Sequence, residues 1–232
     1  MKKKSIKTLL GIGICFLCAA VIVVPALLSS DAESTQKIIV VDPGHGGEDG
    51  GAVGDDGSLE KDLNLQIALT LKEKLEACGY TVVMTRETDE DTDRLNGFHK
   101  KLDLTERVQT AESAKADLFL SVHINASTSA RDQGFQVWYG TGNNNGKFLA
   151  EQIRSHVEEA NVSSRIRVVK PVPETLYIFR TLQIPNVLIE CGFISNAEDL
   201  YQLKQESFRA KLCEAIALGV TDYFSEKKEA IT

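Results

Sequence analysis

Side chains able to bind metal or move protons stand at the ends of three apolar segments that are typical of β-strands. His45 follows the run IIVVDPG, His123 follows DLFLSV, and Glu190 follows NVLI. The carboxyl ends of parallel strands meet at one edge of a sheet, where α/β proteins bind their ligands. We therefore expect these three side chains to meet at one site.

Glu60 is a fourth candidate, because it heads a segment with helical periodicity. It lies on the same side of that helix as Leu63 and Ile67, so its carboxylate faces the core unless something compensates the charge. A metal ion could do so. Zinc takes imidazole nitrogen and carboxylate oxygen, and its catalytic sites commonly use three protein ligands and a water. His45, Glu60 and His123 thus form a candidate His₂Glu set.

The same residues also allow simpler roles. The separations between His45, Glu60 and His123 form no local motif such as H-E-x-x-H, so spacing alone is weak support for a metal. A histidine among glycines can be a surface residue, Glu60 can complement the helix dipole, and His123 can be a hydrogen-bonded core residue. Asp42 and Asn125 can be outer contacts of a metal or substrate, or they can cap turns.

The glycine-rich segment PGHGGEDGG follows a strand, as nucleotide-binding loops do. It contains neither GxxxxGK[ST] nor a GxGxxG that leads directly into a helix, and Glu48, Asp49, Asp55 and Asp56 would repel phosphates. The glycines instead predict a tight backbone turn around His45 that leaves room for an extended substrate.

The elements that must position these residues alternate along the chain. Apolar runs rich in β-branched residues predict strands at residues 38–41, 80–85, 118–124, 134–139 and 186–191. Helical patterns occupy residues 59–78, 103–115, 147–160 and 197–224, the last interrupted near Gln205. The expected fold class is a single α/β domain, a largely parallel twisted sheet with helices on both faces, preceded by an N-terminal membrane-spanning or signal segment.

Composition limits the partners and the redox chemistry. With 33 acidic and 26 basic residues the chain has a formal charge of −7, so it has no basic footprint and we expect no nucleic-acid partner. Beyond the first thirty residues the cysteines are Cys78, Cys191 and Cys213, an odd number without C-x-x-C spacing. We expect buried free thiols and no disulfide framework.

The first thirty residues carry the pattern of an export or anchoring segment. Lys2, Lys3, Lys4 and Lys7 precede an apolar stretch at residues 9–28, which matches the hydrocarbon thickness of a bilayer. The basic end predicts that the N-terminus stays inside and that the rest of the chain is exported. The stretch is long for a signal peptide and no A-x-A cleavage site follows it, which favours a retained anchor over a cleaved signal.

Four sequence blocks resemble those of a known family. VVDPGHGG, LEKDLNL, ADLFLSVHINA and PNVLIECGFISN are similar, in this order, to blocks of the zinc-dependent N-acetylmuramoyl-L-alanine amidases of bacteria, in the class called amidase 3. The resemblance spans residues 38 to about 224. It implies that His45, Glu60 and His123 bind Zn²⁺ and that Glu190 is the catalytic acid and base. The segment holding Arg107 also resembles the family's helix before the second histidine.

The resemblance implies hydrolysis of the amide between N-acetylmuramic acid and L-alanine in peptidoglycan, with Glu190 moving the proton. The expected division of the chain is 1–30 signal or membrane anchor, 31–36 linker, 37–224 catalytic domain and 225–232 tail. A small anchored domain without wall-binding repeats most resembles the spore-cortex and germination amidases. That likeness implies action on the outer face of the cytoplasmic membrane, in the cell wall or in the spore intermembrane space, with help from an accessory protein.

Two functions of other classes use similar residues. One is a peptidoglycan-binding protein that keeps the fold without catalysis, and the intact set of His45, Glu60, His123 and Glu190 argues against it. The other is a zinc exopeptidase acting on free peptides, and the DPGHGG and ECGFISN blocks argue against that. Release of L-alanine amino termini from purified peptidoglycan, with and without a chelator, separates the three.

Overall fold

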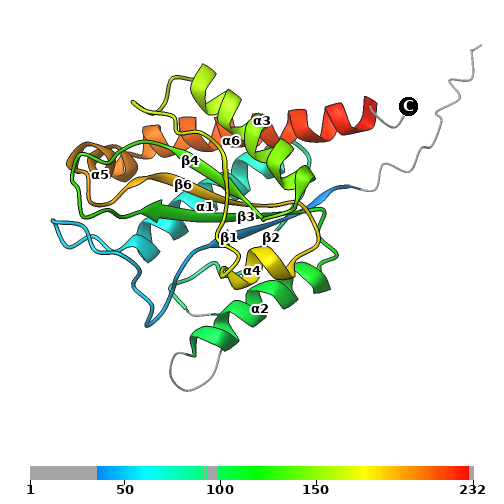
Figure 1. Cartoon of the computed structure of the whole chain (residues 1–232), viewed down its shortest axis with the longest axis horizontal. Helices are drawn as coiled ribbons and strands as arrows, with labels where there is room; N and C mark the ends of the chain where they lie inside the picture. Colours follow the sequence, from blue (N-terminus) through cyan, green and yellow to red (C-terminus); the bar gives the residue numbers. More distant parts are fainter. Residues whose placement is uncertain (1–35, 91, 93–98, 230–232) are drawn as a thin grey trace, which may run out of the picture. The chain divides into compact units, whose positions relative to one another are not determined.

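The computed structural model describes residues 36–90, 92 and 99–229 (Figure 1). The expected anchor at residues 1–30 and all but the last residue of the expected linker lie outside this range. Among the described residues, no helix combines the length and the apolar character needed to cross a bilayer.

A six-stranded sheet forms the centre of the domain (Figure 1). In spatial order its strands are β2 (Thr81–Met84), β1 (Ile38–Pro43), β3 (Leu118–Asn125), β6 (Asn186–Phe193), β4 (Gln136–Tyr139) and β5 (Lys170–Pro171). Neighbouring strands pair in parallel except β4 and β6, which are antiparallel. The prediction of a largely parallel sheet in an α/β domain is confirmed, and the sheet is mixed because of this one antiparallel pair.

The central strands are apolar on both faces because helices cover both. α1 (Glu60–Ala77), α3 (Asn144–Glu159), α5 (Ala197–Lys204) and α6 (Glu206–Glu229) pack on one face, and α2 (Lys100–Ser113) and α4 (Tyr177–Thr181) pack on the other (Figure 1). Each face of the sheet has its own hydrophobic core. In β3, Leu118 and Leu120 belong to the core on the side of α1, and Phe119 belongs to the core on the side of α2. Such double covering makes a strand almost continuously apolar, which is the pattern seen in its sequence.

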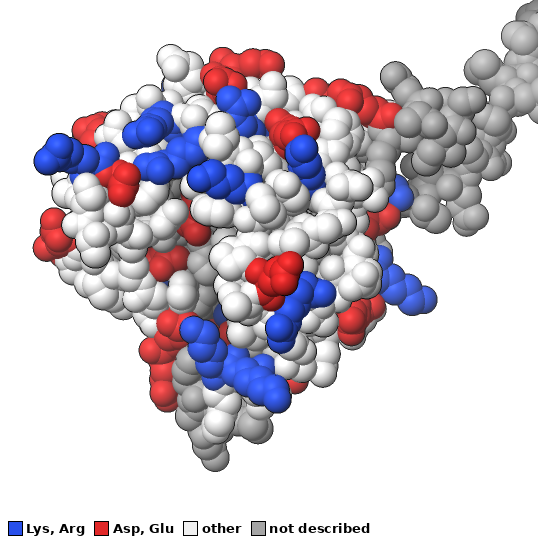
Figure 2. All heavy atoms as spheres, in the orientation of Figure 1, with Lys and Arg blue, Asp and Glu red and all other residues white. Residues whose placement is uncertain are grey.

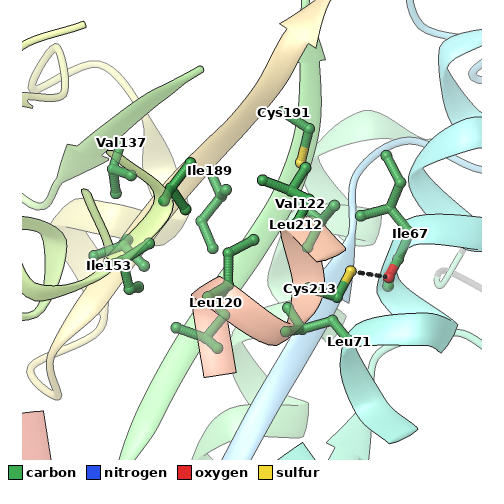
Figure 3. Packing of buried hydrophobic residues seen from close by; sticks show 14 of the residues in the cluster. Ile67, Leu71, Leu120, Val122, Val137, Ile153, Ile189, Cys191, Leu212 and Cys213 are labelled. Atoms are coloured by element: carbon green, nitrogen blue, oxygen red, sulfur yellow. Dashed lines mark hydrogen bonds between the residues drawn. The ribbon is translucent and has the colours of Figure 1, made fainter. Parts of the chain in front are cut away.

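The larger core joins the sheet to α1, α3 and α6 (Figure 3). Ile67 of α1, Leu120 of β3, Ile153 of α3 and Leu212 of α6 are all fully buried there. The Cys213 thiol donates a hydrogen bond to the Ile67 carbonyl at 3.4 Å. This packing fixes α1 against the sheet, and α1 carries Glu60 at its first position.

Several predicted details need correction. β5 and α4 are not among the predicted elements, because their two and five residues are too short to show a period. The expected tail overlaps α6, which continues to Glu229. Cys78 is exposed, because α1 ends at Ala77 and the chain turns at Gly79 with a φ of 89°. The interruption at Gln205 is confirmed, and Cys191 and Cys213 are buried free thiols as expected.

Candidate metal centre

The predicted site residues meet at the carboxyl-terminal edge of the sheet. His45 follows β1, His123 lies near the end of β3, Glu190 lies in β6 and Glu60 begins α1. One ligand-type atom from each of His45, Glu60 and His123 lies within 4.8 Å of the other two. Two imidazoles and one carboxylate form the donor set used by catalytic zinc sites of the His₂Glu type, so the residues present fit such an ion.

Glu60 stands between the two histidines. Its Oε1 lies 3.0 Å from His123 Nδ1, and its Oε2 lies 3.2 Å from His45 Nε2. The two imidazole rings have centroids 5.0 Å apart and are inclined by 75°. The three side chains therefore bring ligand-type atoms within reach of one ion.

The Glu60 carboxylate is buried and well supplied with hydrogen bonds. It is 5% exposed, and it accepts from Ala52 N at 2.9 Å, from Asn64 Nδ2 at 3.2 Å and from Ile124 N at 3.3 Å. Burial alone would raise the pKa of Glu60, but His123 and His45 outweigh it and hold the pKa well below its usual range. The group is thus ionised, as a metal ligand must be.

Asp49 lies at ion-pair distance from the second ring nitrogen of His45, although the pair lacks hydrogen-bond geometry. The Nδ1 atom of His45 lies 2.9 Å from Asp49 Oδ2, which leaves Nε2 facing Glu60. A carboxylate on the second ring nitrogen is the usual outer partner of a metal-binding histidine. Burial lowers the pKa of His45, but the carboxylates of Glu60 and Asp49 outweigh it and raise the pKa to about 8. In the sequence alone, Asp49 is recognisable only as an acidic residue that would repel phosphate.

Glu190 lies next to one of the three candidate ligands, His123, and one of its carboxyl oxygens has no hydrogen-bond partner among the described residues. It is paired with His123 in the register of β3 and β6, and paired residues on parallel strands point to the same face of a sheet. Its Oε2 is buried and receives no hydrogen bond from any described residue. Burial raises the pKa of Glu190 to about 7, with Glu60 adding to the rise and His123 and His45 opposing it. A carboxyl group with this pKa can take up and return a proton near neutral pH.

Asp42 and Asn125 have partners other than the candidate ligands. Asp42 is buried and receives hydrogen bonds at 2.6–2.7 Å from Arg107, Ser121 and Thr85. Burial alone would raise its pKa, but Arg107 and the two hydroxyls hold it below its usual range. Asn125 Oδ1 accepts from the adjacent Ala126 N at 2.8 Å, a local turn contact. Asp42 is thus joined to the His45 loop by Arg107, which also donates to the His45 carbonyl.

Arg86 is a site residue that is not among those predicted from the sequence. It is 6% exposed and donates hydrogen bonds to the backbone carbonyls of Pro43, Gly44 and His45. It stands directly after the predicted strand 80–85. A polar residue at a strand end is the signal that identified His45, His123 and Glu190, and the same signal could have found Arg86.

A cavity of about 230 Å³ opens beside the candidate ligands, between α2 and α4. His45 and His123 line it, and apolar side chains such as Leu104, Tyr177 and Phe179 form much of its wall. The site therefore adjoins a space that a substrate can enter. On the face of the molecule seen in Figure 2, charged side chains lie in separate groups with uncharged surface between them.

Comparisons with known proteins agree with the resemblance in sequence. The model of the family described as N-acetylmuramoyl-L-alanine amidase matches residues 39–222. The chain is 41% identical over 190 residues to the N-acetylmuramoyl-L-alanine amidase LytC of Bacillus subtilis, which covers 81% of this chain and 36% of LytC. The chain thus spans only about a third of that relative's length.

Two further relatives match over most of their length. The germination-specific N-acetylmuramoyl-L-alanine amidase of Bacillus subtilis is 34% identical over 199 residues, covering 82% of this chain and 81% of that protein. The solved structure of the CwlD amidase from Clostridioides difficile, in complex with the GerS lipoprotein, has a TM-score of 0.76 and 33% identity. That match covers 82% of this chain and 99% of the solved chain.

Proposed function

The chain belongs to the N-acetylmuramoyl-L-alanine amidase family, and we propose that it hydrolyses the amide between N-acetylmuramic acid and L-alanine in peptidoglycan with a bound zinc ion. His45, Glu60 and His123 would hold the ion. The observation that carries the proposal is the convergence of these three side chains within 4.8 Å, beside the register-paired Glu190.

The proposed mechanism gives two carboxylates different tasks. When bound, zinc lowers the pKa of a water and polarises the scissile carbonyl. Glu190 accepts the proton of the attacking water at its carboxyl group and returns it to the leaving alanine nitrogen. Glu60 remains ionised, because the two imidazoles beside it stabilise its charge. The difference arises from environment, since Glu60 has an imidazole beside each oxygen and Glu190 Oε2 has no hydrogen-bond donor among the described residues.

The cavity between α2 and α4 supports a substrate that extends past the reacting bond. It begins at His45 and His123 and continues along Leu104 and Tyr177. We assign to it the part of the peptidoglycan strand next to the scissile amide. Aliphatic and aromatic walls suit the apolar faces of sugar rings and short aliphatic side chains.

We also propose a role in spore-cortex maturation or germination, assisted by an accessory protein. The germination-specific relative matches over 81% of its length, and CwlD was solved with a lipoprotein partner. The basic and apolar pattern of residues 1–30 supports an anchor or signal that leaves the catalytic domain, residues 37–224, outside the cytoplasmic membrane. Peptidoglycan lies on that side.

The test uses the full chain and purified peptidoglycan, with new L-alanine amino termini measured by chemical labelling. We expect release of these termini, its loss with a chelator and its recovery on adding zinc. Binding to the wall without release would instead indicate a non-catalytic peptidoglycan-binding protein. Release of residues from free peptides, with intact peptidoglycan untouched, would indicate a zinc exopeptidase.

A further inference from the structure

Two buried arginines hold the backbone that carries His45. The His45 carbonyl oxygen accepts one hydrogen bond from Arg86 Nε and one from Arg107 Nη2, each at 2.8 Å. The Pro43 carbonyl oxygen accepts from the same two side chains, at 3.2 Å from Arg86 and 2.9 Å from Arg107. The arginines are 6% and 2% exposed, so little water competes for these bonds.

The backbone at His45 needs such support. Its φ is 61°, in the left-handed region that residues with a Cβ disfavour, and Gly46 and Gly47 continue with φ values of 140° and 55°. A side-chain-bearing residue keeps this conformation only where surrounding contacts hold it. Hydrogen bonds from two guanidinium groups to the His45 carbonyl are contacts of this kind.

Arg86 also joins the His45 loop to the helix that carries Glu60. Its Nη2 donates to the Gly44 carbonyl at 3.1 Å and to the Lys61 carbonyl at 2.9 Å, and Lys61 directly follows Glu60 in the first turn of α1. Every hydrogen bond from Arg86 to a described residue ends on a backbone carbonyl. The planar guanidinium fork makes this possible, and the ammonium of lysine cannot reproduce it.

Arg107 supports the same loop from α2. Its Nε and Nη2 bind the Asp103 carboxylate at 2.9 and 3.2 Å, and its Nη1 binds Asp42 at 2.6 Å. These two buried carboxylates compensate the guanidinium charge, which burial would otherwise make costly. Arg107 is thereby fixed between α2 and β1 with donors left for Pro43 and His45.

We propose that Arg86 is a positioning residue of the metal centre, supported by Arg107, and that it sets His45 against Glu60 before any ion binds. The proposal rests on the proposed function, in which His45 and Glu60 help to hold a divalent cation of the zinc type. Its alternative is a loop that the bound ion itself organises. The two differ in whether the His45 loop is already fixed in the metal-free protein.

The Arg86→Lys variant of the full chain tests the first consequence, because it keeps the charge and removes the fork. Zinc affinity of the metal-free protein is measured by competition with a chromogenic chelator. We expect about 10- to 100-fold weaker binding, as is typical when an outer contact of a metal ligand is lost. We also expect an altered visible spectrum of the Co²⁺-substituted protein, since that spectrum reports ligand geometry.

The matched control is Arg209→Lys. Arg209 Nη1 also donates to two backbone carbonyls, those of Leu203 and Lys204 at the end of α5. We expect this variant to keep the parent's zinc affinity and Co²⁺ spectrum. A folded Arg86→Lys protein with the parent's zinc affinity and Co²⁺ spectrum would overturn the proposal.

Hydrogen exchange of the unaltered protein tests the proposal even where Arg86→Lys does not fold. The Gly44 N–H donates to the Val122 carbonyl and the Gly46 N–H to the Asp49 carbonyl, at 2.9 and 3.0 Å. We expect slow exchange at both amides without metal and little further slowing with zinc. Fast exchange that only zinc suppresses would overturn the proposal. A protein whose amides are protected but which binds no zinc would contradict the proposed function instead.

Discussion

Glu190 of β6 and His123 of β3 are register partners on adjacent parallel strands, so the sheet itself holds the proposed acid and base next to a candidate metal ligand. Neither side chain depends on a flexible loop for its place. The pairing of β3 with β6 therefore also sets the distance between the Glu190 carboxyl group and the His123 imidazole.

Replacing Glu190 by Gln should abolish proton transfer and leave metal binding intact. We expect kcat to fall by about 10²- to 10⁴-fold, the usual contribution of a positioned acid or base. Amino-terminus release gives kcat, and chelator competition gives zinc affinity. Glu214→Gln, at an exposed position in α6, is the control and should be fully active. Normal turnover by Glu190→Gln would remove Glu190 from the mechanism.

The titration of Glu190 should be visible in the metal-free protein. Burial raises its pKa to about 7, so the folded state keeps a proton that the unfolded state loses near pH 4.5. The associated stability is fully present below pH 4.5 and is lost as pH rises to about 7. From 1.36 kcal/mol per pKa unit, the parent should lose about 2–3 kcal/mol of unfolding free energy relative to Glu190→Gln over this range. Carboxyl ¹³C NMR and denaturant unfolding measure both effects, and a midpoint near 4.5 would contradict the prediction.

Removing either candidate histidine should remove the metal. We expect His45→Ala and His123→Ala to lose stoichiometric zinc and all amidase activity, because a two-ligand site holds zinc poorly. Zinc content after gel filtration and peptidoglycan hydrolysis are the measurements. His156→Ala is the control, since His156 pairs with Asp222 at 2.7 Å between α3 and α6. Retention of zinc by both site variants would mean that the ion binds elsewhere.

Zinc binding should release a proton from His45. Its pKa of about 8 in the metal-free protein means that most molecules carry this proton at pH 7. The stabilisation that the protonated ring gives the metal-free fold is complete below pH 6.5 and is lost as pH rises through 8. Zinc affinity should thus rise about tenfold per pH unit below pH 8 and level off above it. Calorimetry in buffers of different ionisation enthalpy counts the released protons, and a pH-independent affinity would contradict this.

A methyl group at Gly44 should displace the ring of His123. A Cβ there would stand 2.1 Å from His123 Cε1 and 2.2 Å from Nε2. We expect Gly44→Ala to lose zinc and about 1–3 kcal/mol of unfolding free energy, the usual cost of forced overpacking. Gly50→Ala in the same glycine-rich segment is the control, because its nearest neighbour would be Leu59 Cδ2 at 3.9 Å. Equal effects of the two variants would rule out the specific clash.

The parts of the fold that could be predicted are those that the residue pattern of a single segment determines. β3 opens with the continuous apolar run Leu118, Phe119 and Leu120 because both faces are covered, so its type and its start were visible in the sequence. His123 and Glu190 were recognisable because each is a polar residue that interrupts an apolar run of its strand. The antiparallel pairing of β4 with β6 depends on how the chain returns to the sheet, and residue types do not record that.

Arg86 and Arg107 could be noticed in the sequence, but their contacts with the backbone could not be predicted. Arg86 and Arg107 bind carbonyl oxygens, and every residue has a carbonyl, so no pattern of residue types marks the acceptor. Asp49 is four residues after His45, and the turn between them, which includes a bridge between Gly46 and Asp49, brings the two side chains together. Such contacts follow from loop geometry, which the types of residues in one sequence do not determine.

The arginine contacts to the His45 loop have a consequence for how the protein would acquire its ion. A loop that is held by the protein's own side chains does not need the ion in order to fold, so folding and loading become separate events in time. Stripping the ion would then leave a compact protein able to reload from its surroundings. Activity would then rise and fall reversibly with the local supply of the metal. The chain would stay folded, and so protected from aggregation and proteolysis, through each loss and rebinding of the ion.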